Sequence, residues 1–232
     1  GHNIKIHMGT GATTFNSETV AFYKNLGASR VVLDRQLTVE EIGIIASRSS
    51  DIELEVFALN QKCHNIDGFC TFQHGITAMK YPFLSRVWNI KLVKRLLNLY
   101  PGDTSKIEEA IFRKELGCCL DYEISDNGLK LEPEKKTMLA QYFDASNFLN
   151  RCGACALYEL NKLKIGYVKI VGREDLTAKK IKDIRFIRSA IELLKDNLKE
   201  QDFIEKVKAR YTELHSSNCE AKFCYYLPNF PG

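Results

Sequence analysis

GASRVVLDRQLTVEEIGIIASRSSDIELEVFAL, residues 27–59, is the stretch that decides the fold. Its apolar run Arg30–Leu33 and its second run Ile52–Leu59 have the continuous apolar character of buried parallel strands. Between the two runs, Thr38 and Glu41 form the T-x-x-E pattern of a capping box, which predicts the first turn of a helix. Strand, helix and strand in this order predict two parallel strands joined by a crossover helix.

The same alternation continues on both sides of this stretch. Ile4–Met8 predicts an earlier strand, and Asn16 or Ser17 can cap the helix that follows it. Near the other end, a helix at Leu157–Leu163 precedes a buried strand at Tyr167–Val171. The fold class we expect is therefore α/β with parallel βα units.

The number of strands suggests an incomplete barrel. Four strands are visible, with a possible fifth at Thr137–Phe143, whereas an ordinary (β/α)₈ barrel closes with eight. We therefore expect a partial TIM-barrel-like half-barrel that exposes sheet edges. A second chain or a self-dimer is the expected partner at these edges.

We expect residues 1–232 to form a single α/β domain with an insertion. Residues 62–144 break the alternation directly after the third strand, and residues 177–214 predict C-terminal helices. The apolar positions that predict an amphipathic helix there are Ile181, Ile184, Ile187, Ile191, Leu194 and Leu198. The positions that predict a second helical piece are Phe203, Val207, Tyr211 and Leu214.

Composition narrows the class of protein without identifying it. The chain is 45% hydrophobic and 27% charged, with a formal net charge of +4, which is ordinary for a globular protein. It has no apolar run of the ~18 residues that a membrane span needs, so we expect no membrane association. No signal peptide is visible, and we expect a cytoplasmic protein.

Eight cysteines are many for a cytoplasmic chain, where thiols stay reduced, and they favour metal binding over disulfides. Most have polar or glycine neighbours, which is typical of loops rather than of a core face. The alternative is that they are small buried apolar side chains. Thiolate sulfur suits either an iron–sulfur cluster or zinc, and His64, His74 and His215 are further candidate zinc ligands. The candidate metal ligands are Cys63, Cys70, Cys118, Cys119, Cys152, Cys155, Cys219 and Cys224.

Several motifs resemble those of the collagenase-like peptidase family, unclassified peptidase family 32. Gly27–Ile42 resembles the family stretch lG-x-x-RvvLsREltleEI, and Glu53–Phe57 resembles its E-x-E-x-F strand. The other matches are Cys63-x6-Cys70 with its first cysteine pair, Cys118–Tyr122 with C-R-x-x-Y, and Lys169–Arg173 with K-I-E-G-R. The resemblance runs in the family's order from residue 27 to residue 173.

The resemblance implies a function as well as a fold. Members of the family resemble oxygen-independent hydroxylation factors for ribosomal RNA, transfer RNA or ubiquinone, in which four cysteines hold a [4Fe–4S] cluster. By position, the ligands here are Cys63, Cys70, Cys118 or Cys119, and Cys152. Cys155, Cys219 and Cys224 have no counterpart in this set, which leaves a second site open.

The candidate catalytic residues lie near the expected strand ends and are Arg35, Glu55, Lys169 and Arg173. Ordinary salt bridging across a barrel mouth is the alternative role for these four. Leu59 and Val171 stand where the family has histidine and glutamate, so two side chains suited to proton transfer are missing. The leading hypothesis is a cluster-binding redox protein that acts on an RNA base, a quinone or another small cyclic substrate. The alternatives are a non-catalytic metal-stabilised partner that completes another chain's barrel, and a peptidase.

Overall fold

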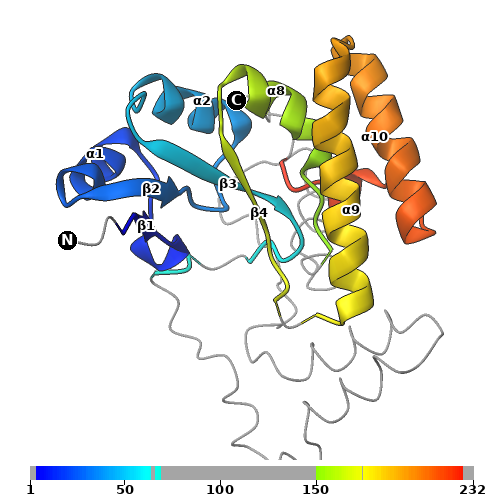
Figure 1. Ribbon diagram of the computed structural model, residues 1–232, viewed down its shortest axis with the longest axis horizontal. Coiled ribbons are helices and arrows are strands. Elements are labelled where there is room, and N and C mark those ends of the chain that lie inside the picture. The colour runs from blue at the N-terminus through cyan, green and yellow to red at the C-terminus, as the bar shows by residue number, and fades with distance from the viewer. Residues whose placement is uncertain (1–3, 64–65, 69–149, 174, 227–232) are drawn as a thin grey trace, which may run out of the picture.

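The computed structural model describes residues 4–63, 66–68, 150–173 and 175–226. Its centre is a four-stranded parallel sheet whose strands stand side by side in sequence order (Figure 1). The strands are β1 (Ile6–Met8), β2 (Ala28–Val32), β3 (Glu53–Leu59) and β4 (Tyr167–Ile170). The helices around them are α1 (Ser17–Asn25), α2 (Val39–Ser47), α8 (Leu157–Lys162), α9 (Thr177–Leu193) and α10 (Glu200–His215). The predicted α/β class is confirmed.

The first two helices begin where the sequence provides a cap. The Asn16 side chain accepts a hydrogen bond of 2.8 Å from the backbone N–H of Thr19 at the start of α1. At α2, Thr38 accepts from the backbone of Glu41, and the Glu41 carboxylate accepts from the backbone of Thr38. Each bond satisfies an N–H group that the helix itself leaves without a partner. The predicted capping box is confirmed.

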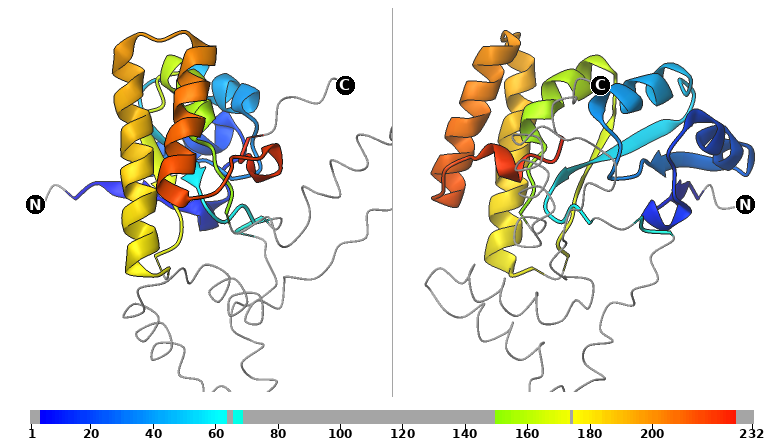
Figure 2. Two further views of the ribbon diagram at one scale, coloured as in Figure 1. Left: turned by 90° about the vertical axis from the view of Figure 1, so that its right-hand side faces the viewer. Right: turned by 180° about the vertical axis from the view of Figure 1, so that it is seen from behind.

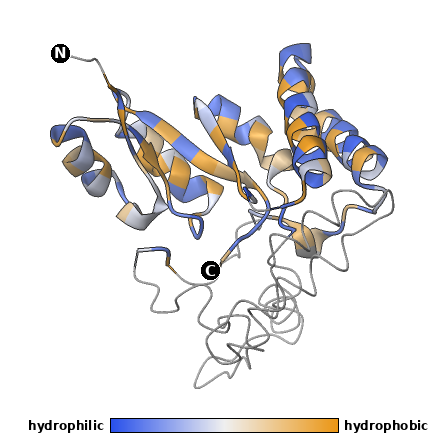
Figure 3. Ribbon diagram, turned by 60° about the horizontal axis from the view of Figure 1, so that its bottom comes forward, coloured by the Kyte–Doolittle hydropathy of each residue, from blue (hydrophilic) through white to orange (hydrophobic). Residues whose placement is uncertain are grey.

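The helix-covered face of the sheet carries the main core. Val31, Leu54 and Val56 point to this face and lie in one apolar cluster with Ile42 of α2 and Phe186 of α9. Side chains alternate between the two faces of a strand, so the residues between them point away from the helices. Figure 3 shows hydrophilic and hydrophobic residues interspersed along the ribbon of the strands and helices.

Helices α9 and α10 pack side by side, joined through a 3₁₀ turn, η4 (Leu194–Asp196) (Figure 2). They confirm the predicted C-terminal helices, but not the face that the isoleucine pattern indicates. Ile181, Ile184 and Ile191 are 43%, 57% and 40% exposed. The side chains of α9 that are buried are Asp183, Phe186, Ile187 and Ala190.

The reason for this shift lies in Asp183, a charged residue that a hydrophobic pattern assigns to solvent. Its carboxylate is buried with three partners of its own, Asn60, Lys179 and His215. A buried carboxylate is stable only with such partners, and these come from other turns and elements that the local pattern does not reveal.

The opposite face of the sheet has a smaller apolar cluster near the carboxyl ends of the strands. Val32 and Phe57 pack there against Tyr225, which comes from the C-terminal segment. The Phe57 and Tyr225 rings are stacked with centroids 5.9 Å apart, and the Tyr226 hydroxyl donates to the Phe57 carbonyl at 2.7 Å. Three short 3₁₀ turns complete the described elements: η1 (Thr10–Ala12), η3 (Ala154–Ala156) and η5 (Ala221–Phe223).

Most of the predicted insertion, residues 62–144, lies outside the described residues, as does the possible strand Thr137–Phe143. Whether the chain forms a half-barrel or one domain therefore stays a prediction. Within the described part, no helix is long and apolar enough to span a membrane.

Candidate functional site at the carboxyl ends of the strands

Charged side chains collect where β2 and β3 end. Asp34 and Arg35 follow β2, and Asn60 and Lys62 follow β3. All four are at most 8% exposed, which is unusual for charged or polar side chains in a loop. The carboxyl ends of parallel strands are where α/β proteins build their sites. This edge of the sheet is therefore the candidate functional site.

Three cations are buried close to one another at this edge: Arg35, Lys62 and Arg151. We call them the strand-end cation group. The Arg35 guanidinium donates to Asp67 at 2.6 and 3.0 Å and to the Gln61 carbonyl at 2.5 Å. The Lys62 ammonium donates to the Tyr225 carbonyl at 2.6 Å. The C-terminal segment therefore helps to position the group.

Lys62 responds strongly to this environment. Burial lowers the pKa of its ammonium, and the positive charges of Arg151 and Arg35 lower it further, to about 7. Lys62 therefore changes charge near neutral pH, where an exposed lysine stays charged. A strongly perturbed pKa at a strand-end site is a common mark of function.

Asp34 lies on the other side of Arg35. Burial raises the pKa of this carboxyl above its ordinary value, and the negative charge of Asp67 adds to the effect. The backbone N–H groups of Arg35 and Gln36 and the charge of Arg35 oppose the rise. The site thus combines a carboxyl group that holds its proton more tightly with a lysine that holds its proton less tightly.

A buried polar network supports the site from behind. Asn60 donates to the Val171 carbonyl at 3.0 Å and to the Asp183 carboxylate at 2.7 Å, which joins the ends of β3 and β4 to α9. Burial alone would raise the pKa of Asp183, but hydrogen bonds from His215 and Asn60 and the charge of Lys179 hold it below its ordinary value. His215, a candidate zinc ligand, is bonded to Asp183 at 3.1 Å instead.

The backbone of Asn60 has an unusual conformation. Its φ of 65° lies in the left-handed region, which glycine and asparagine adopt most readily. Leu59, at the position of the family's histidine, is buried in the core at 2% exposure.

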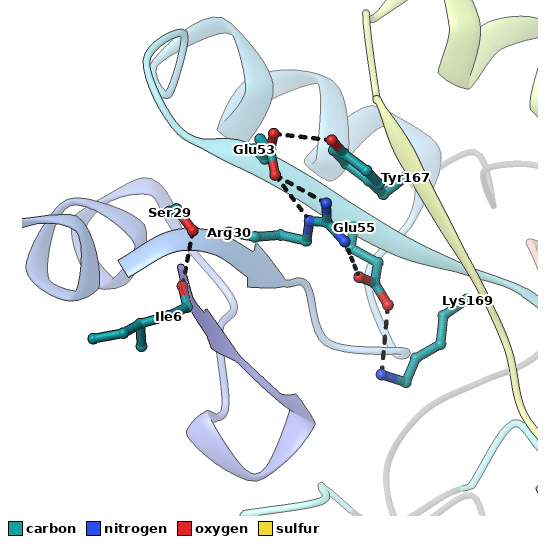
Figure 4. A network of polar contacts seen from close by, with 7 residues as sticks. All are labelled: Ile6, Ser29, Arg30, Glu53, Glu55, Tyr167 and Lys169. Atoms are coloured by element: carbon teal, nitrogen blue, oxygen red, sulfur yellow. Dashed lines mark hydrogen bonds and ion pairs between the residues drawn. The ribbon is translucent and has the colours of Figure 1, made fainter. Parts of the chain in front are cut away.

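Two of the predicted catalytic residues, Glu55 and Lys169, are brought together on the face away from the helices (Figure 4). Their charged atoms are 3.5 Å apart, and Glu55 also lies 3.5 Å from Arg30. Arg30 in turn donates to Glu53, which accepts from the Tyr167 hydroxyl at 2.9 Å. Hydrogen bonds from Tyr167 and Arg30 hold the pKa of Glu53 below its ordinary value.

We call this row the cross-strand ladder; its members are Arg30, Glu53, Glu55, Tyr167 and Lys169. It corresponds to the salt-bridging alternative for Glu55 and Lys169. Arg35 is not part of the ladder, because it lies in the loop after β2. Arg173 is exposed in the turn after β4, where its carbonyl accepts from Lys180 at 3.2 Å. Catalytic roles for these four residues stay predictions.

The thiols form a separate group. Cys152, Cys155, Cys219 and Cys224 are free, half-buried, and close enough that their thiolates would repel one another. Cys63 is also free and half-buried, and its carbonyl accepts from the Gln36 amide at 3.1 Å. Cys70, Cys118 and Cys119 lie outside the described residues, together with His64 and His74.

Of the cluster ligands that the resemblance implies, Cys63, Cys70, Cys118 or Cys119, and Cys152, only Cys63 and Cys152 lie in the described part of the chain. Their convergence on one site therefore stays a prediction. Cys152 also lies near Cys155, Cys219 and Cys224, which have no counterpart in the family pattern. In the described ranges, no three His, Cys, Asp or Glu side chains already stand in a metal-coordinating arrangement.

Sequence reasoning missed Asp34, Lys62, Arg151 and Asp183. Lys62 immediately precedes Cys63, and Arg151 immediately precedes Cys152. A cation directly before each of these two cysteines was the available signal. Lys62 and Arg151 stand out as candidate site residues because they are buried, and a local sequence pattern does not show that burial.

The fold and site define an α/β protein with a buried, cation-rich site at the ends of its strands. Residues 1–81 match the sequence model of peptidase family U32. The predicted resemblance to this family is therefore confirmed over that segment.

Proteins of known function match over a short part of their length. The tRNA hydroxylation protein P of Haemophilus influenzae is 41% identical over 68 residues, which are 29% of this chain and 15% of that protein. The Escherichia coli protein of the same name is 37% identical over 65 residues, 28% of this chain and 14% of its own length. tRNA hydroxylation protein P1 of Bacillus subtilis is 33% identical over 76 residues, which are 33% of this chain and 18% of that protein. The chain thus spans less than a fifth of these relatives, and no solved structure matches it.

Proposed function

We propose that this chain belongs to an oxygen-independent hydroxylation system that modifies tRNA and depends on an iron–sulfur cluster, with zinc as the alternative metal. The observation that carries the proposal is the match of three tRNA hydroxylation proteins, at 33–41% identity, to part of a chain whose strand ends form a buried cationic site. An RNA base is therefore favoured over a quinone as the substrate.

The strand-end cation group suits an RNA ligand. Arginine and lysine side chains bind phosphate through charge-assisted hydrogen bonds, and RNA presents one phosphate per nucleotide. Arg35, Lys62 and Arg151 come from three segments, so the site depends on the folded chain rather than on a flexible basic tail. Cys63 follows Lys62 directly, which would bring one proposed cluster ligand next to the bound RNA.

The arrangement of the sheet supports the half-barrel proposal. The described strands run in sequence order, and the main core lies on one face only. A doubly wound sheet reverses its strand order and carries helices on both faces, whereas a (β/α) barrel does neither. In a barrel, the cross-strand ladder would face the interior.

The second candidate function, a metal-stabilised partner that completes another chain's barrel, is favoured by the same face. The ladder is polar but only partly exposed: the Glu55 side chain is 15% exposed and that of Arg30 is 17% exposed. Additional strands from a partner or from another part of the protein would close over it. The peptidase alternative has no such support.

Binding of purified tRNA to the full chain tests the proposal, with Lys62→Met as the central variant. Loss of one buried phosphate contact is expected to weaken binding about tenfold. The exposed Lys195 in η4 provides the control, because Lys195→Met removes the same charge far from the site and should leave affinity unchanged. Equal effects of the two variants would contradict the proposal.

The pH dependence of tRNA binding gives a sharper test. The pKa of Lys62 is about 7 in the free protein, so its charge, and with it the affinity, should decrease as the pH rises through 7. Lys62→Arg keeps the charge at every accessible pH, and its affinity should stay level over the same range. A Lys62→Arg profile that decreases as steeply as the wild type would mean that another group titrates.

A further inference from the structure

Positive charge is concentrated on one helix outside the strand-end site. Helix α9 has 17 residues, with five lysines and arginines and only two acids, Asp183 and Glu192. The neighbouring helix α10 has three lysines and arginines and four acids. The formal net charge of the whole chain is only +4, so α9 carries most of the excess. A local excess of one sign attracts a partner of the opposite sign.

The two acids of α9 do not offset the charge of its outer face. Asp183 is buried and binds Lys179 at 3.0 Å on the inner side of the helix. Glu192 pairs with Arg188 at 3.0 Å, but both side chains are more than half exposed, and such a pair contributes little. The charge that α9 presents to solvent is therefore positive.

Three cations form a row on this outer face: Lys182, Arg185 and Arg188. We call them the α9 cation row. All three are exposed, and they follow one another every third residue, so the row extends about 9 Å along the helix axis. Lys182 and Arg185 have no ion-pair partner among the described residues. Their charges are therefore available to a ligand.

The row begins next to the strand-end site. Figure 1 shows α9 starting at the end of the sheet where β4 ends. Asp183, which follows Lys182 in the chain, accepts from the Asn60 amide at 2.7 Å. Asn60 stands two residues before Lys62, a member of the strand-end cation group. The first turns of α9 are thus tied directly to the loop that carries this group.

Arg173 adds a further cation between β4 and α9. It is exposed in the turn that joins them, and Lys180 donates to its carbonyl at 3.2 Å, which ties the turn to the first part of the helix. Positive side chains therefore continue from the strand ends onto the outer face of α9. A ligand that contacts both groups has to be extended and carry repeated negative charge.

RNA, an anionic membrane and an acidic protein segment all carry such charge. A membrane is disfavoured by Ile181 and Ile184, which are 43% and 57% exposed on the same face as the cations. A helix that lies in a membrane surface separates its apolar side from its charged side instead. RNA carries one phosphate per nucleotide, and arginine and lysine bind phosphate through charge-assisted hydrogen bonds. The relatives that match this chain are named for tRNA hydroxylation, which favours RNA over an acidic protein.

We propose that the α9 cation row binds the phosphate backbone of a tRNA whose target nucleotide lies in the strand-end site. The inference rests on the proposed function and adds the surface that holds a second part of the same RNA. Phosphate contacts position a nucleic acid without reading its sequence. The row therefore contributes affinity for any tRNA, and salt weakens that contribution.

Titration of the full chain with purified tRNA at several salt concentrations tests the proposal. The triple variant Lys182→Gln, Arg185→Gln and Arg188→Gln should bind at least about tenfold more weakly at low salt. The slope of log affinity against log salt should become shallower by about 2–3, because each lost phosphate contact removes about 0.7–0.9. All three positions are exposed, so the far-UV circular dichroism of the variant should match that of the wild type.

A second triple variant is the matched control: Lys195→Gln, Lys206→Gln and Arg210→Gln. It removes the same charge from exposed positions outside the row, and like the first variant it breaks one exposed ion pair, that of Arg210 with Glu213. Its affinity and salt slope should stay close to those of the wild type. Equal losses in the two triple variants would mean that net charge alone attracts the RNA, and would overturn the proposal.

Lys62→Met separates this inference from the proposed function. If Lys62→Met weakens tRNA binding and the row variant keeps the affinity and slope of the wild type, the row is wrong and the strand-end site stands. The reverse result supports the row and contradicts the strand-end site, and a wild type that binds no tRNA overturns both. Vesicles of phosphatidylserine and phosphatidylcholine test the membrane. Vesicle binding that the row variant loses, with tRNA binding unchanged, would overturn the assignment to RNA.

Discussion

The two faces of the sheet are stabilised in different ways. The face toward the helices is apolar from β2 to α10, and Phe186 and Phe203 are fully buried there. The face away from the helices carries the cross-strand ladder at one end and the Phe57–Tyr225 stack at the other. One face is held by packing, and the other by partly exposed ion pairs together with a distant segment of the chain.

This difference indicates which face of the sheet can accommodate a functional site. A packed core restricts every side chain in it, since changes of a single methylene are felt. The opposite face tolerates charge and collects residues from segments far apart in sequence, including Arg151 and Tyr225. The candidate site lies at the end of this second face. If the comparison is correct, the two faces should respond differently to substitution.

The largest effect is expected on the helix-covered face, for Phe186→Ala. The ring is fully buried and packs edge-on against Tyr211 and His215, with centroids 5.4 and 5.3 Å away. Removing a buried phenyl group leaves a cavity and should lower the free energy of unfolding by about 3–5 kcal/mol. Urea unfolding followed by far-UV circular dichroism measures the change.

Ile184→Ala, two residues earlier on the same helix, is the matched control. Ile184 is 57% exposed, so its substitution should change stability by no more than about 0.5 kcal/mol. A large loss for Ile184→Ala would mean that its face of α9 is covered in solution, as the isoleucine pattern first indicated.

Much of the first half of the sheet follows from local sequence. The two helix starts are predicted by the capping residues Asn16, Thr38 and Glu41. The strands are predicted by the apolar runs around Val31 and Val56. These signals are local because caps act within one turn and buried strands need continuous apolar residues. The structure places the corresponding elements within two residues of the expected bounds.

The candidate site is harder to predict from local sequence because it depends on contacts between residues far apart in the chain. Lys62 meets Tyr225 across 163 positions, and Asn60 meets Asp183 across 123. The cysteines were recognised as candidate ligands from their number and their neighbours. Their grouping depends on how α9 and α10 return the chain to β3, which spacing alone does not determine.

A smaller effect is expected for Asp183→Asn, which tests the network between the core and the site. The amide keeps the shape of the side chain but removes its negative charge. That charge pairs with Lys179, and the carboxylate oxygen that carries it accepts a hydrogen bond from Asn60. The free energy of unfolding at neutral pH should therefore decrease by about 1.5–3 kcal/mol. Lys179 keeps its second partner, Asp175, at 2.9 Å, which limits the loss.

The pH dependence of the stability difference between wild type and Asp183→Asn tests whether the lost charge causes that difference. The pKa of Asp183 is lower in the folded protein than its ordinary value, so its contribution is present above the unfolded pKa and is lost as the pH falls through the folded pKa. The stabilities of wild type and Asp183→Asn should therefore converge in acid. A constant difference at every pH would point to altered packing instead.

The smallest effect is expected on the ladder, for Glu55→Gln. Glu55 meets Arg30 and Lys169 at 3.5 Å, the Lys169 side chain is 37% exposed, and Arg30 keeps its closer bonds to Glu53. Ion pairs of this kind contribute about 0–1 kcal/mol, and salt weakens them. The substitution should therefore lower stability only slightly, and the difference from wild type should shrink as sodium chloride is added. Chemical unfolding by urea at low and high salt measures it. A loss as large as that of Phe186→Ala, unaffected by salt, would mean that Glu55 is buried in solution, as it would be if further strands close over this face.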